Sequence, residues 1–311
     1  MSTAEPDPPP GWRRCLPGSP EYPVLLGQVR QPPALVVRGT LEPAAEMVAV
    51  VGARRLTAYG EEIAYQMGAH LAAAGVTVVS GMARGIDAAA HRGALDGGGR
   101  TVAVMGTGPD TIYPPEHRGL AERIAAGGAL VTQFPAGTRP LRQNFPSRNE
   151  VISGLSLGVV VVEARRQSGA MLTAGSAGSQ GRTVMAVPGS VHNPASRGCH
   201  DLIRDGAALV TSAQEVLRLL HSDPMFQLVL PGVGRAARRG YGDTRDLVVS
   251  ALEAGSLTLD EVVAAVAKPS AEVVTAVARL RLDEAVRLRD GSYGLATAPP
   301  NRNRSAGNRV V

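Results

Sequence analysis

The sequence predicts a doubly wound α/β domain with a mostly parallel sheet, followed by a small C-terminal winged-helix domain. Between residues 47 and 221, short β-branched runs recur, and stretches of helical composition separate most of them. Their starts lie roughly 25 to 29 residues apart, the length that a strand, a crossover helix and short loops need, and such connections make the strands parallel. The runs are apolar throughout, as expected for strands covered by helices on both faces.

The elements follow in order along the chain. Residues 1–46 are rich in proline and are predicted to form an irregular lead-in with one short strand at 34–38. The runs that follow are the predicted strands, at 48–52, 76–81, 101–106, 129–134, 158–164, 183–189 and 207–211. The predicted helices include 60–74, 87–95 and 212–220. A leucine-rich solenoid has a similar period, but the chain lacks its repeated LxxLxL consensus.

After residue 221 the pattern stops. Residues 222–245 combine prolines, glycines and arginines, which predicts a flexible basic linker that acts as a solvated spacer or contacts phosphates. Residues 246–296 predict three helices and a hairpin with an Asp-Gly turn, which is a winged-helix pattern. The expected helices are 246–254, 258–267 and 271–282. Residues 297–311 are predicted to form a disordered basic tail.

Charge and composition narrow the class of ligand. The formal net charge is +5, and Lys268 is the only lysine, so nearly every cation is arginine, the better residue for bidentate phosphate contacts. A GC-rich genome would produce the same bias. Cys15 and Cys199 lie too far apart in sequence for a zinc motif or a disulfide framework, and the six histidines form no metal-binding cluster. We therefore predict no metal and no cofactor.

The chain is expected to act in the cytoplasm. No apolar run reaches the length of roughly 18 residues that a transmembrane helix needs, so no membrane span is predicted. The first residues, MSTAEPDPPPGWRR, are acidic and proline-rich, unlike a signal peptide. Aromatic residues make up 3%, which argues against an extended base-stacking platform.

In doubly wound sheets, ligands bind outside the carboxyl ends of the strands, so the segments after each strand hold the candidate site. The turn after the first strand lacks GxGxxG, and no acid ends the second strand to hold a ribose, which argues against dinucleotide binding. In the segment after the second strand, small residues leave room for backbone N–H groups to face an anion ahead of a helix start. The candidates from these two segments are Gly52, Arg54, Thr57, Ser80, Gly81, Arg84 and Gly85.

Two further segments add candidates. The loop after the fourth strand concentrates arginines around Phe145, a pattern that suits binding to a phosphate backbone with a base stacked on the ring. An equally good interpretation is that Phe145 anchors the loop in the core. Glu163 ends the fifth strand and needs partners, either the loop after the first strand or Arg148. Asp87 and His91 are interpreted as a hydrogen-bonded pair on a helix surface. The candidates here are Phe145, Arg148, Asn149, Glu163, Ser168 and Gly169.

The missing motifs point away from catalysis. The chain has no Walker lysine, no GxSxG, no HExxH and no close carboxylate pair with an evident metal role. The residues therefore predict an anion-binding α/β domain with arginines at the ligand edge and no evident catalytic set, so an enzyme is not the expected function.

The chain resembles the DNA-processing protein A family, also called DprA or Smf. The matching stretches, in family order over most of residues 35–220, are VAVVGARRLTAYG at 48–60, SGMARGIDAAAHRGAL at 80–95, GTGPDTIYP at 106–114, QNFPSRNEVISGLS at 143–156, VVVVEARRQSGAMLTA at 159–174 and AVPGS at 186–190. The resemblance implies an extended Rossmann-like domain that binds single-stranded DNA without cleaving it. It also implies a homodimer and the loading of the recombinase RecA onto incoming strands during natural transformation.

The resemblance also implies roles for particular residues. The family's DNA-contacting arginine matches Arg54, and its FPxRN loop matches Phe145, Pro146, Arg148 and Asn149. Its small-residue pocket matches Gly52, Ser80, Gly81, Arg84 and Gly85.

Three departures from the family pattern stand out. Glu150 replaces an arginine, which removes a positive charge beside the expected DNA track, and Ala53 stands where a serine is common. The helical N-terminal extension of the family is expected to be largely absent.

Two other functions stay open on the residues alone. One is a Rossmann-like enzyme that processes nucleoside monophosphates, with Glu163 as its acid, although the PGGxGTxxE loop of such enzymes is missing. The other is a docking scaffold whose winged helix binds a protein partner.

Overall fold

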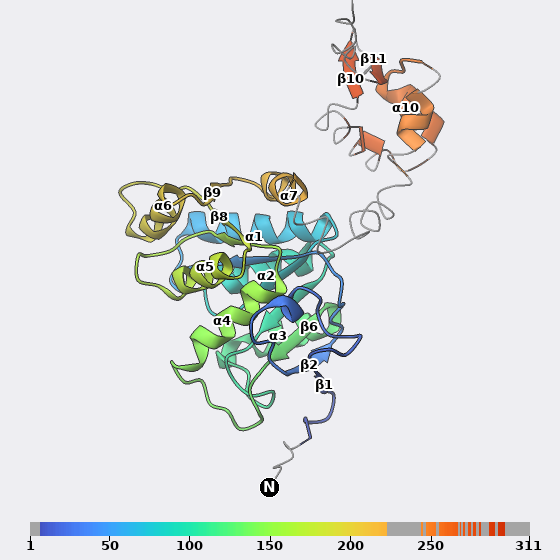
Figure 1. The fold of residues 1–311 in the computed structure, drawn as a ribbon. Helices are drawn as coiled ribbons and strands as arrows, with labels where there is room; N and C mark the ends of the chain where they lie inside the picture. Colours follow the sequence, from blue (N-terminus) through green and yellow to red (C-terminus); the bar gives the residue numbers. More distant parts are fainter. Residues whose placement is uncertain are drawn as a thin grey trace, which may run out of the picture. The chain divides into compact units, whose positions relative to one another are not determined.

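The structure, a computed structural model, describes residues 7–222 together with 244, 247–252, 255–266, 268, 270, 273–274, 276–277, 280, 286–289 and 292–295. The chain forms two compact units, Met1–Val233 and Gly234–Val311. The first unit is built on one nine-stranded sheet with helices on both faces (Figure 1), which confirms the predicted α/β class.

The sheet has the strand order β1-β2-β6-β5-β4-β3-β7-β8-β9. Its strands are β1 (Arg13–Cys15), β2 (Leu35–Gly39), β3 (Met47–Val51), β4 (Thr77–Ser80), β5 (Thr101–Val104), β6 (Ala129–Thr132), β7 (Gly158–Val161), β8 (Thr183–Ala186) and β9 (Ala208–Leu209). Strands β3 to β9 pair in parallel, whereas β2 is antiparallel to both β1 and β6. Consecutive strands run outward from β3 in one direction and from β7 in the other, so the order reverses between these two neighbours.

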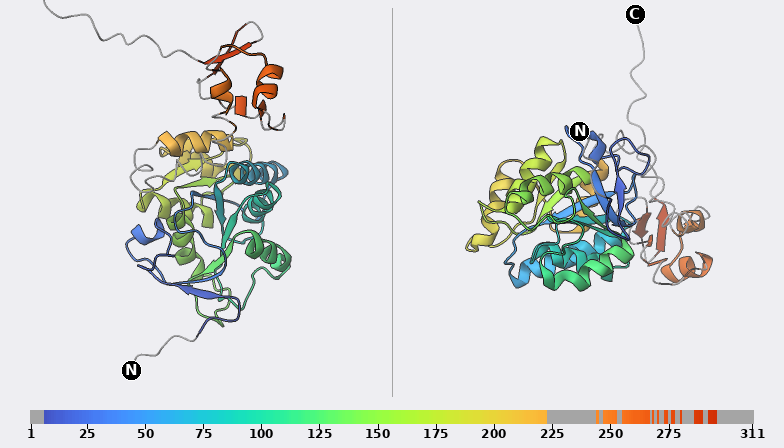
Figure 2. Two further views of the ribbon diagram at one scale, coloured as in Figure 1. Left: turned by 90° about the vertical axis from the view of Figure 1, so that its right-hand side faces the viewer. Right: turned by 90° about the horizontal axis from the view of Figure 1, so that it is seen from below.

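The helices form two layers around the sheet. They are α1 (Ala58–Ala73), α2 (Ile86–Asp96), α3 (Arg118–Gly127), α4 (Asn144–Leu155), α5 (Gly169–Ser179), α6 (Arg197–Arg204) and α7 (Ala213–Ser222), with single 3-10 turns at Leu26–Gln28, Pro115–His117 and Pro194–Ser196. Helices α4, α5 and α6 cover one face, and α1, α2 and α3 cover the other (Figure 2). The interiors of β3 to β7 are fully covered, which explains their unbroken apolar runs.

Local sequence sets the start of α1. Thr57 is its N-cap, and the Thr57 hydroxyl oxygen accepts a hydrogen bond from the amide of Gly60 at 3.1 Å. Glu61 lies in the first turn, where a negative charge suits the helix dipole.

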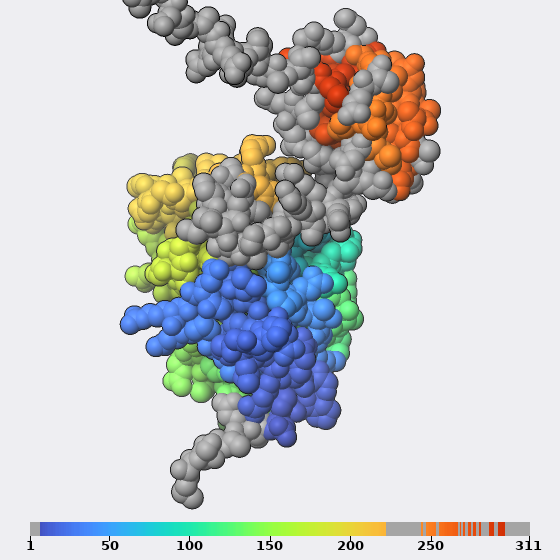
Figure 3. Space-filling model, turned by 45° about the vertical axis from the view of Figure 1, so that its right-hand side comes forward, coloured from blue at the N-terminus to red at the C-terminus, as the bar shows by residue number. Residues whose placement is uncertain are grey.

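Residues 7–46 are more ordered than the expected irregular lead-in. The predicted strand near 34–38 is present as β2, but β1 was not predicted, because three residues reading Arg-Arg-Cys carry no alternating pattern. Tyr22 and Leu26 are buried, and Leu26 packs beside Gly154 of α4. The N-terminal residues, drawn in dark blue, form a continuous part of the surface in Figure 3.

The second unit matches the predicted small helix–hairpin domain where it is described. Residues 247–252 are helical, α10 spans Leu259–Val266, and the hairpin strands β10 (Val286–Arg289) and β11 (Ser292–Leu295) pair antiparallel. A separate apolar cluster, which includes Val248, Val262, Val273 and Val286, forms its core. The predicted linker, apart from Ser222 and Thr244, and the predicted tail lie outside the described residues.

Candidate nucleic-acid interface

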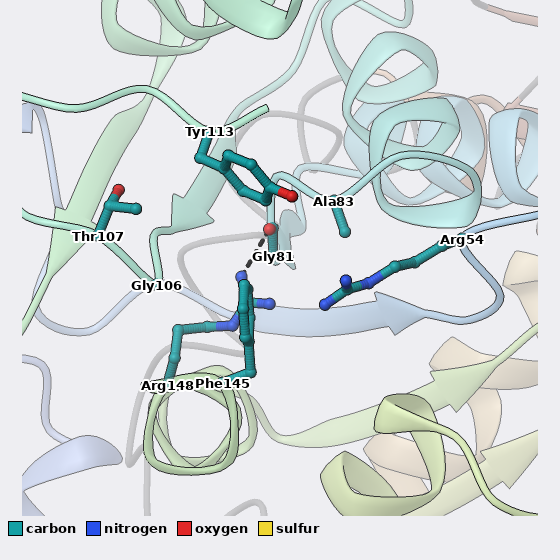
Figure 4. A pocket seen from close by; sticks show the side chains of 8 residues that line it. All are labelled: Arg54, Gly81, Ala83, Gly106, Thr107, Tyr113, Phe145 and Arg148. Atoms are coloured by element: carbon teal, nitrogen blue, oxygen red, sulfur yellow. Dashed lines mark hydrogen bonds between the residues drawn. The ribbon is translucent and has the colours of Figure 1, made fainter. Parts of the chain in front are cut away.

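A pocket opens at the carboxyl ends of β3, β4 and β5, beside the N-terminal half of α4 (Figure 4). The residues that line it are Arg54, Gly81, Ala83, Gly106, Thr107, Tyr113, Phe145 and Arg148. Four of them, Arg54, Gly81, Phe145 and Arg148, were predicted as site residues from the sequence. The pocket lies at the edge where ligands bind in doubly wound sheets.

The ring of Phe145 lies close to two guanidinium groups. The guanidinium carbon of Arg54 lies 4.8 Å from the ring centroid and that of Arg148 lies 5.4 Å from it. Both distances are within the range of cation–π attraction. Arg54 is exposed and reaches into the pocket from the end of β3, whereas Phe145 is half-buried (Figure 4). The pocket thus presents one accessible cation next to one accessible aromatic ring.

Arg148 forms the buried wall of the pocket. It is 4% exposed, and its Nη1 donates to the carbonyl oxygens of Gly81 at 2.6 Å and Val104 at 2.7 Å. Burial lowers the pKa of Arg148 to about 10, an effect that the attraction of Asp87 opposes and the repulsion of Arg54 adds to. Arg148 therefore stays charged at neutral pH, and its Nη1 holds the ends of β4 and β5 together.

The glycines of the turn after β4 permit close packing between loops. A Cβ atom on Gly81 would lie 2.5 Å from Nη1 of Arg148 and 2.8 Å from Oδ2 of Asp87. Gly85 has a φ of +82°, and a Cβ there would overlap the carbonyl oxygens of Ala53 and Arg54. The glycines therefore bring the Arg54 turn and the Arg148 wall together.

Ser80 and Arg84 lie beside the pocket without lining it. The buried hydroxyl of Ser80 donates to the carbonyl oxygen of Val50 at 2.6 Å, which joins β4 to β3. Arg84 is exposed and forms an ion pair with Glu116. Arg54, in contrast, lines the pocket, is exposed and has no ion pair with any described residue. It is therefore the accessible cation of the pocket.

Glu163 is bonded to the turn after β3, which was one of the two alternatives for it. Its carboxylate accepts from the Thr57 amide at 3.0 Å and from the Thr57 hydroxyl at 2.6 Å. It is 1% exposed, and Gly60 packs directly against it. Gly52 lies between Ile86 and the Glu163 backbone. Glu163 thus fixes the turn that carries Arg54.

The remaining candidates lie between α4 and α5. Asn149 accepts a hydrogen bond from Nε of Arg148 at 3.2 Å and donates to the carbonyl oxygen of Gly169, also at 3.2 Å. Ser168 is the N-cap residue of α5, but its side chain makes no capping bond. Ser168 and Gly169 do not line the pocket.

Asp87 and His91 do not form the helix-surface pair expected from their spacing; both are buried. Oδ2 of Asp87 accepts from the amide of Ala83 at 3.3 Å. Nδ1 of His91 lies 2.7 Å from the Thr101 hydroxyl, whose own proton goes to the carbonyl oxygen of Val78. His91 therefore carries its proton on Nδ1. The i, i+4 spacing was read as a surface face because the sequence does not reveal that α2 packs against both α1 and the sheet.

The burial of His91 makes stability depend on pH. Burial, helped by the charges of His117 and Arg148, lowers the pKa of His91 to about 3. The unfolded chain binds a proton below a pKa of about 6.5 while the folded chain does not, so stability falls as the pH drops through that value. Between pH 7 and pH 5 the loss due to His91 is expected to reach about 2 kcal/mol.

Urea unfolding of the parent and of His91→Gln at both pH values measures this loss. Burial raises the pKa of Asp87, which acts in the opposite direction, but Asp87 is present in both proteins and cancels in the difference. An equal change in the unfolding free energy of the two proteins would show that His91 is not the group responsible.

Sequence reasoning missed Tyr113 as a pocket residue. Its side chain is 37% exposed and faces the pocket from the side opposite α4 (Figure 4). Gly106 and Thr107 also line the pocket. The available signal was an aromatic residue in the segment after a strand in a chain with 3% aromatics.

The loop after β6 adds exposed positive charge near the pocket. Arg139 and Arg142 are exposed and form no ion pair with any residue that the structure describes. Asn144 anchors this loop, because its amide group donates to the carbonyl oxygens of Gly106 at 3.2 Å and Arg139 at 3.1 Å.

The residues that the structure describes lack two kinds of structural feature. They contain no group of three or more histidine, cysteine, aspartate or glutamate side chains placed to hold a metal ion. None of their helices has both the length and the apolar character needed to cross a membrane.

Comparison with protein families gives a match over most of the first unit. The model of the family described as DNA recombination-mediator protein A matches residues 13–221. Protein Smf of Escherichia coli is 47% identical over 209 residues, which cover 66% of this chain and 56% of that protein. The putative DNA processing protein DprA of Mycobacterium tuberculosis is 41% identical over 265 residues, which cover 83% of this chain and 66% of that protein.

Solved structures agree with the family match. DNA processing protein A (DprA) from Streptococcus pneumoniae superposes with a TM-score of 0.64 at 38% identity, over 67% of this chain and 74% of that chain. DNA processing protein A from Helicobacter pylori, whose structure concerns its single-stranded DNA binding mode, superposes with a TM-score of 0.61 at 25% identity. The match covers 68% of this chain and 96% of that chain.

Proposed function

The chain belongs to the DNA recombination-mediator protein A family, and from that premise we propose that it binds single-stranded DNA at the pocket of Arg54, Tyr113 and Phe145 without cleaving it. The observation that carries the proposal is the exposed guanidinium of Arg54, 4.8 Å from the half-buried ring of Phe145. A nucleotide offers a phosphate for the cation and a base for the ring, and the pocket presents both partners together.

Each pocket residue has a separate task in this proposal. Arg54 pairs with a phosphate, and its planar group allows two parallel hydrogen bonds. A base stacks near Phe145 and Tyr113, an interaction that does not depend on the identity of the base. Arg148 holds the ends of β4 and β5 in place beside the Phe145 ring and adds a buried positive charge to the pocket. The pocket therefore favours single strands, whose bases are free to stack, over duplex.

The hydrogen bonds that Glu163 accepts from Thr57 support a binding function over a hydrolytic one. A nucleotide-processing enzyme at this edge would need that carboxylate as its acid, but the Thr57 amide and hydroxyl hold it and the side chain is 1% exposed. Release of a free base from a panel of nucleotides would favour the enzyme instead.

The wider biology is proposed at the level of the family. We propose that the protein acts in the cytoplasm as a homodimer and that it loads RecA onto incoming single strands during natural transformation. The support is the family match and the names of the relatives, which refer to DNA processing and recombination mediation.

Replacing Arg54 with alanine is expected to weaken single-strand binding about 5-fold at 0.1 M salt, because one phosphate contact is lost. The salt dependence of the logarithm of the affinity is expected to fall by about 0.7 per decade of salt for the same reason. Fluorescence anisotropy of a labelled oligonucleotide across a salt series, with the matching duplex as competitor, measures both.

Arg55→Ala is the matched control, since Arg55 is exposed, carries the same charge, neighbours Arg54 and does not line the pocket. It is expected to have the smaller effect. Equal affinity of Arg54→Ala and the parent would remove Arg54 from the site.

A further inference from the structure

The loops after β3, β7 and β8 lie side by side at the carboxyl edge of the sheet. These strands are neighbours in the order β3-β7-β8, and they pair in parallel. Thr57, in the segment after β3, is bonded to Glu163 after β7 at 2.6 Å and 3.0 Å. The carboxyl edge therefore continues without a break from the Arg54 turn to the loop after β7 (Figure 1).

The loops after β7 and β8 are joined in turn. The amide of Ala164 donates to the carbonyl oxygen of Ala195 at 2.7 Å, and the amide of Gly198 donates to the carbonyl oxygen of Ala164 at 2.8 Å. Arg165 follows Ala164 and Arg197 precedes Gly198 in the chain. These backbone bonds consequently bring the chain at Arg165 close to the chain at Arg197, although the two residues are 32 positions apart in sequence.

The surface that Arg165 and Arg197 form is positive and open. Both side chains are exposed, and neither has an ion pair among the residues that the structure describes. Arg166, next in the chain, is bound to Asp201, which also binds Arg204, so two arginines share that one carboxylate. Positive charge thus exceeds negative charge at this end of the sheet edge.

Apolar side chains are exposed on the same elements. Leu172, in the first turn of α5, is 56% exposed, and Val191, in the loop after β8, is 73% exposed. A small anion would make no favourable contact with these aliphatic side chains. A nucleic acid strand offers phosphates to the arginines and base faces to the aliphatic side chains, so it is the partner that fits this mixture.

We infer that the DNA-binding surface does not end at the Arg54 pocket but continues past β7 to a second phosphate-binding segment formed by Arg165 and Arg197. The inference rests on the proposed function. Adjacent strands lie about 4.8 Å apart, so the ends of β3 and β8 are separated by about 10 Å along the sheet edge. A single strand held in the pocket crosses this distance by running perpendicular to the β-strands, and a longer oligonucleotide reaches Arg165 and Arg197.

The test uses the full chain with Arg165→Gln and Arg197→Gln combined. The matched control is Arg30→Gln with Arg218→Gln, which removes the same charge from two exposed arginines, one before β2 and one within α7. Anisotropy with labelled thymidine oligonucleotides of about 4 to about 16 nucleotides, a typical range of single-strand site sizes, gives the affinity of each protein.

The expected result depends on length. Short oligonucleotides that fill only the pocket bind the parent and the double variant alike. Longer ones are expected to bind the double variant about 25-fold more weakly at 0.1 M salt, with a salt slope lower by about 1.4, because two phosphate contacts are lost. The control pair is expected to retain the parent's affinity and slope at every length.

Other outcomes overturn the inference in distinguishable ways. If the parent binds long oligonucleotides and the double variant binds them equally well, the extension is absent while the pocket function stands. If the parent binds no oligonucleotide of any length, the proposed function fails first. An altered sedimentation coefficient of the double variant with unchanged DNA affinity would assign Arg165 and Arg197 to a protein–protein contact instead.

Discussion

Replacing Arg148 with methionine is expected to lower the free energy of unfolding by about 3–5 kcal/mol, the usual range for removing one member of a buried charged network. The side chain is 4% exposed and serves the carbonyl oxygens of Gly81 and Val104. Without it these acceptors lose their partner, and the buried Asp87 loses the attraction of a buried cation. Equilibrium unfolding in urea measures the change.

Arg54→Met is the matched control for this substitution. Arg54 faces the same Phe145 ring but is exposed, so its replacement is expected to change the unfolding free energy by no more than about 0.5 kcal/mol while still reducing DNA affinity. Adding Asp87→Asn to Arg148→Met is expected to recover part of the lost stability, since the uncompensated carboxylate is then gone. If Arg148→Met alone lowers the free energy of unfolding by less than about 1 kcal/mol, the buried hydrogen bonds of Arg148 do not stabilise the fold as expected.

Replacing Gly85 with alanine is expected to lower the unfolding free energy by about 2–4 kcal/mol and to disrupt DNA binding as well. The left-handed backbone at a φ of +82° strains any residue with a Cβ atom. In addition, that atom would overlap the carbonyl oxygens of Ala53 and Arg54, so the turn that carries Arg54 must move.

Gly75→Ala separates the two causes. Gly75 has a φ of +84° but open space around its Cβ position, so only the backbone strain applies and a loss of about 1 kcal/mol is expected. Urea unfolding and anisotropy on both variants give the comparison. Equal losses for Gly75→Ala and Gly85→Ala would mean that the contact with the Arg54 turn contributes nothing.

The sequence predicted the architecture and half of the pocket's lining. Apolar runs with a regular period predicted the parallel strands because burial on both faces leaves a direct mark on composition. Arg54, Gly81, Phe145 and Arg148 were predicted from their places after the strands, and the structure brings these four together.

Other features depend on contacts between distant segments and leave no local pattern. The burial of Arg148 depends on carbonyl groups 67 and 44 positions away. His91 bonds to a threonine on a strand instead of to Asp87 one turn away, and β1 is only three residues long. Tyr113 was within reach of sequence reasoning, but its loop gave no sign of which way the ring would face.

The short outermost strands have a consequence for how copies of this protein behave toward one another. A sheet edge with unpaired N–H and C=O groups is a template for aggregation, and very short edge strands limit it. Here the edges are β1 and β9, of three and two residues. A fragment beginning at residue 47, the domain start that the sequence suggested, would lack β1 and β2 and would leave β6 as the edge, with the backbone of Leu130 and Val131 without its partner strand. The proline-rich segment before β3 therefore covers an edge of the sheet that would otherwise be open to edge-to-edge pairing with another copy.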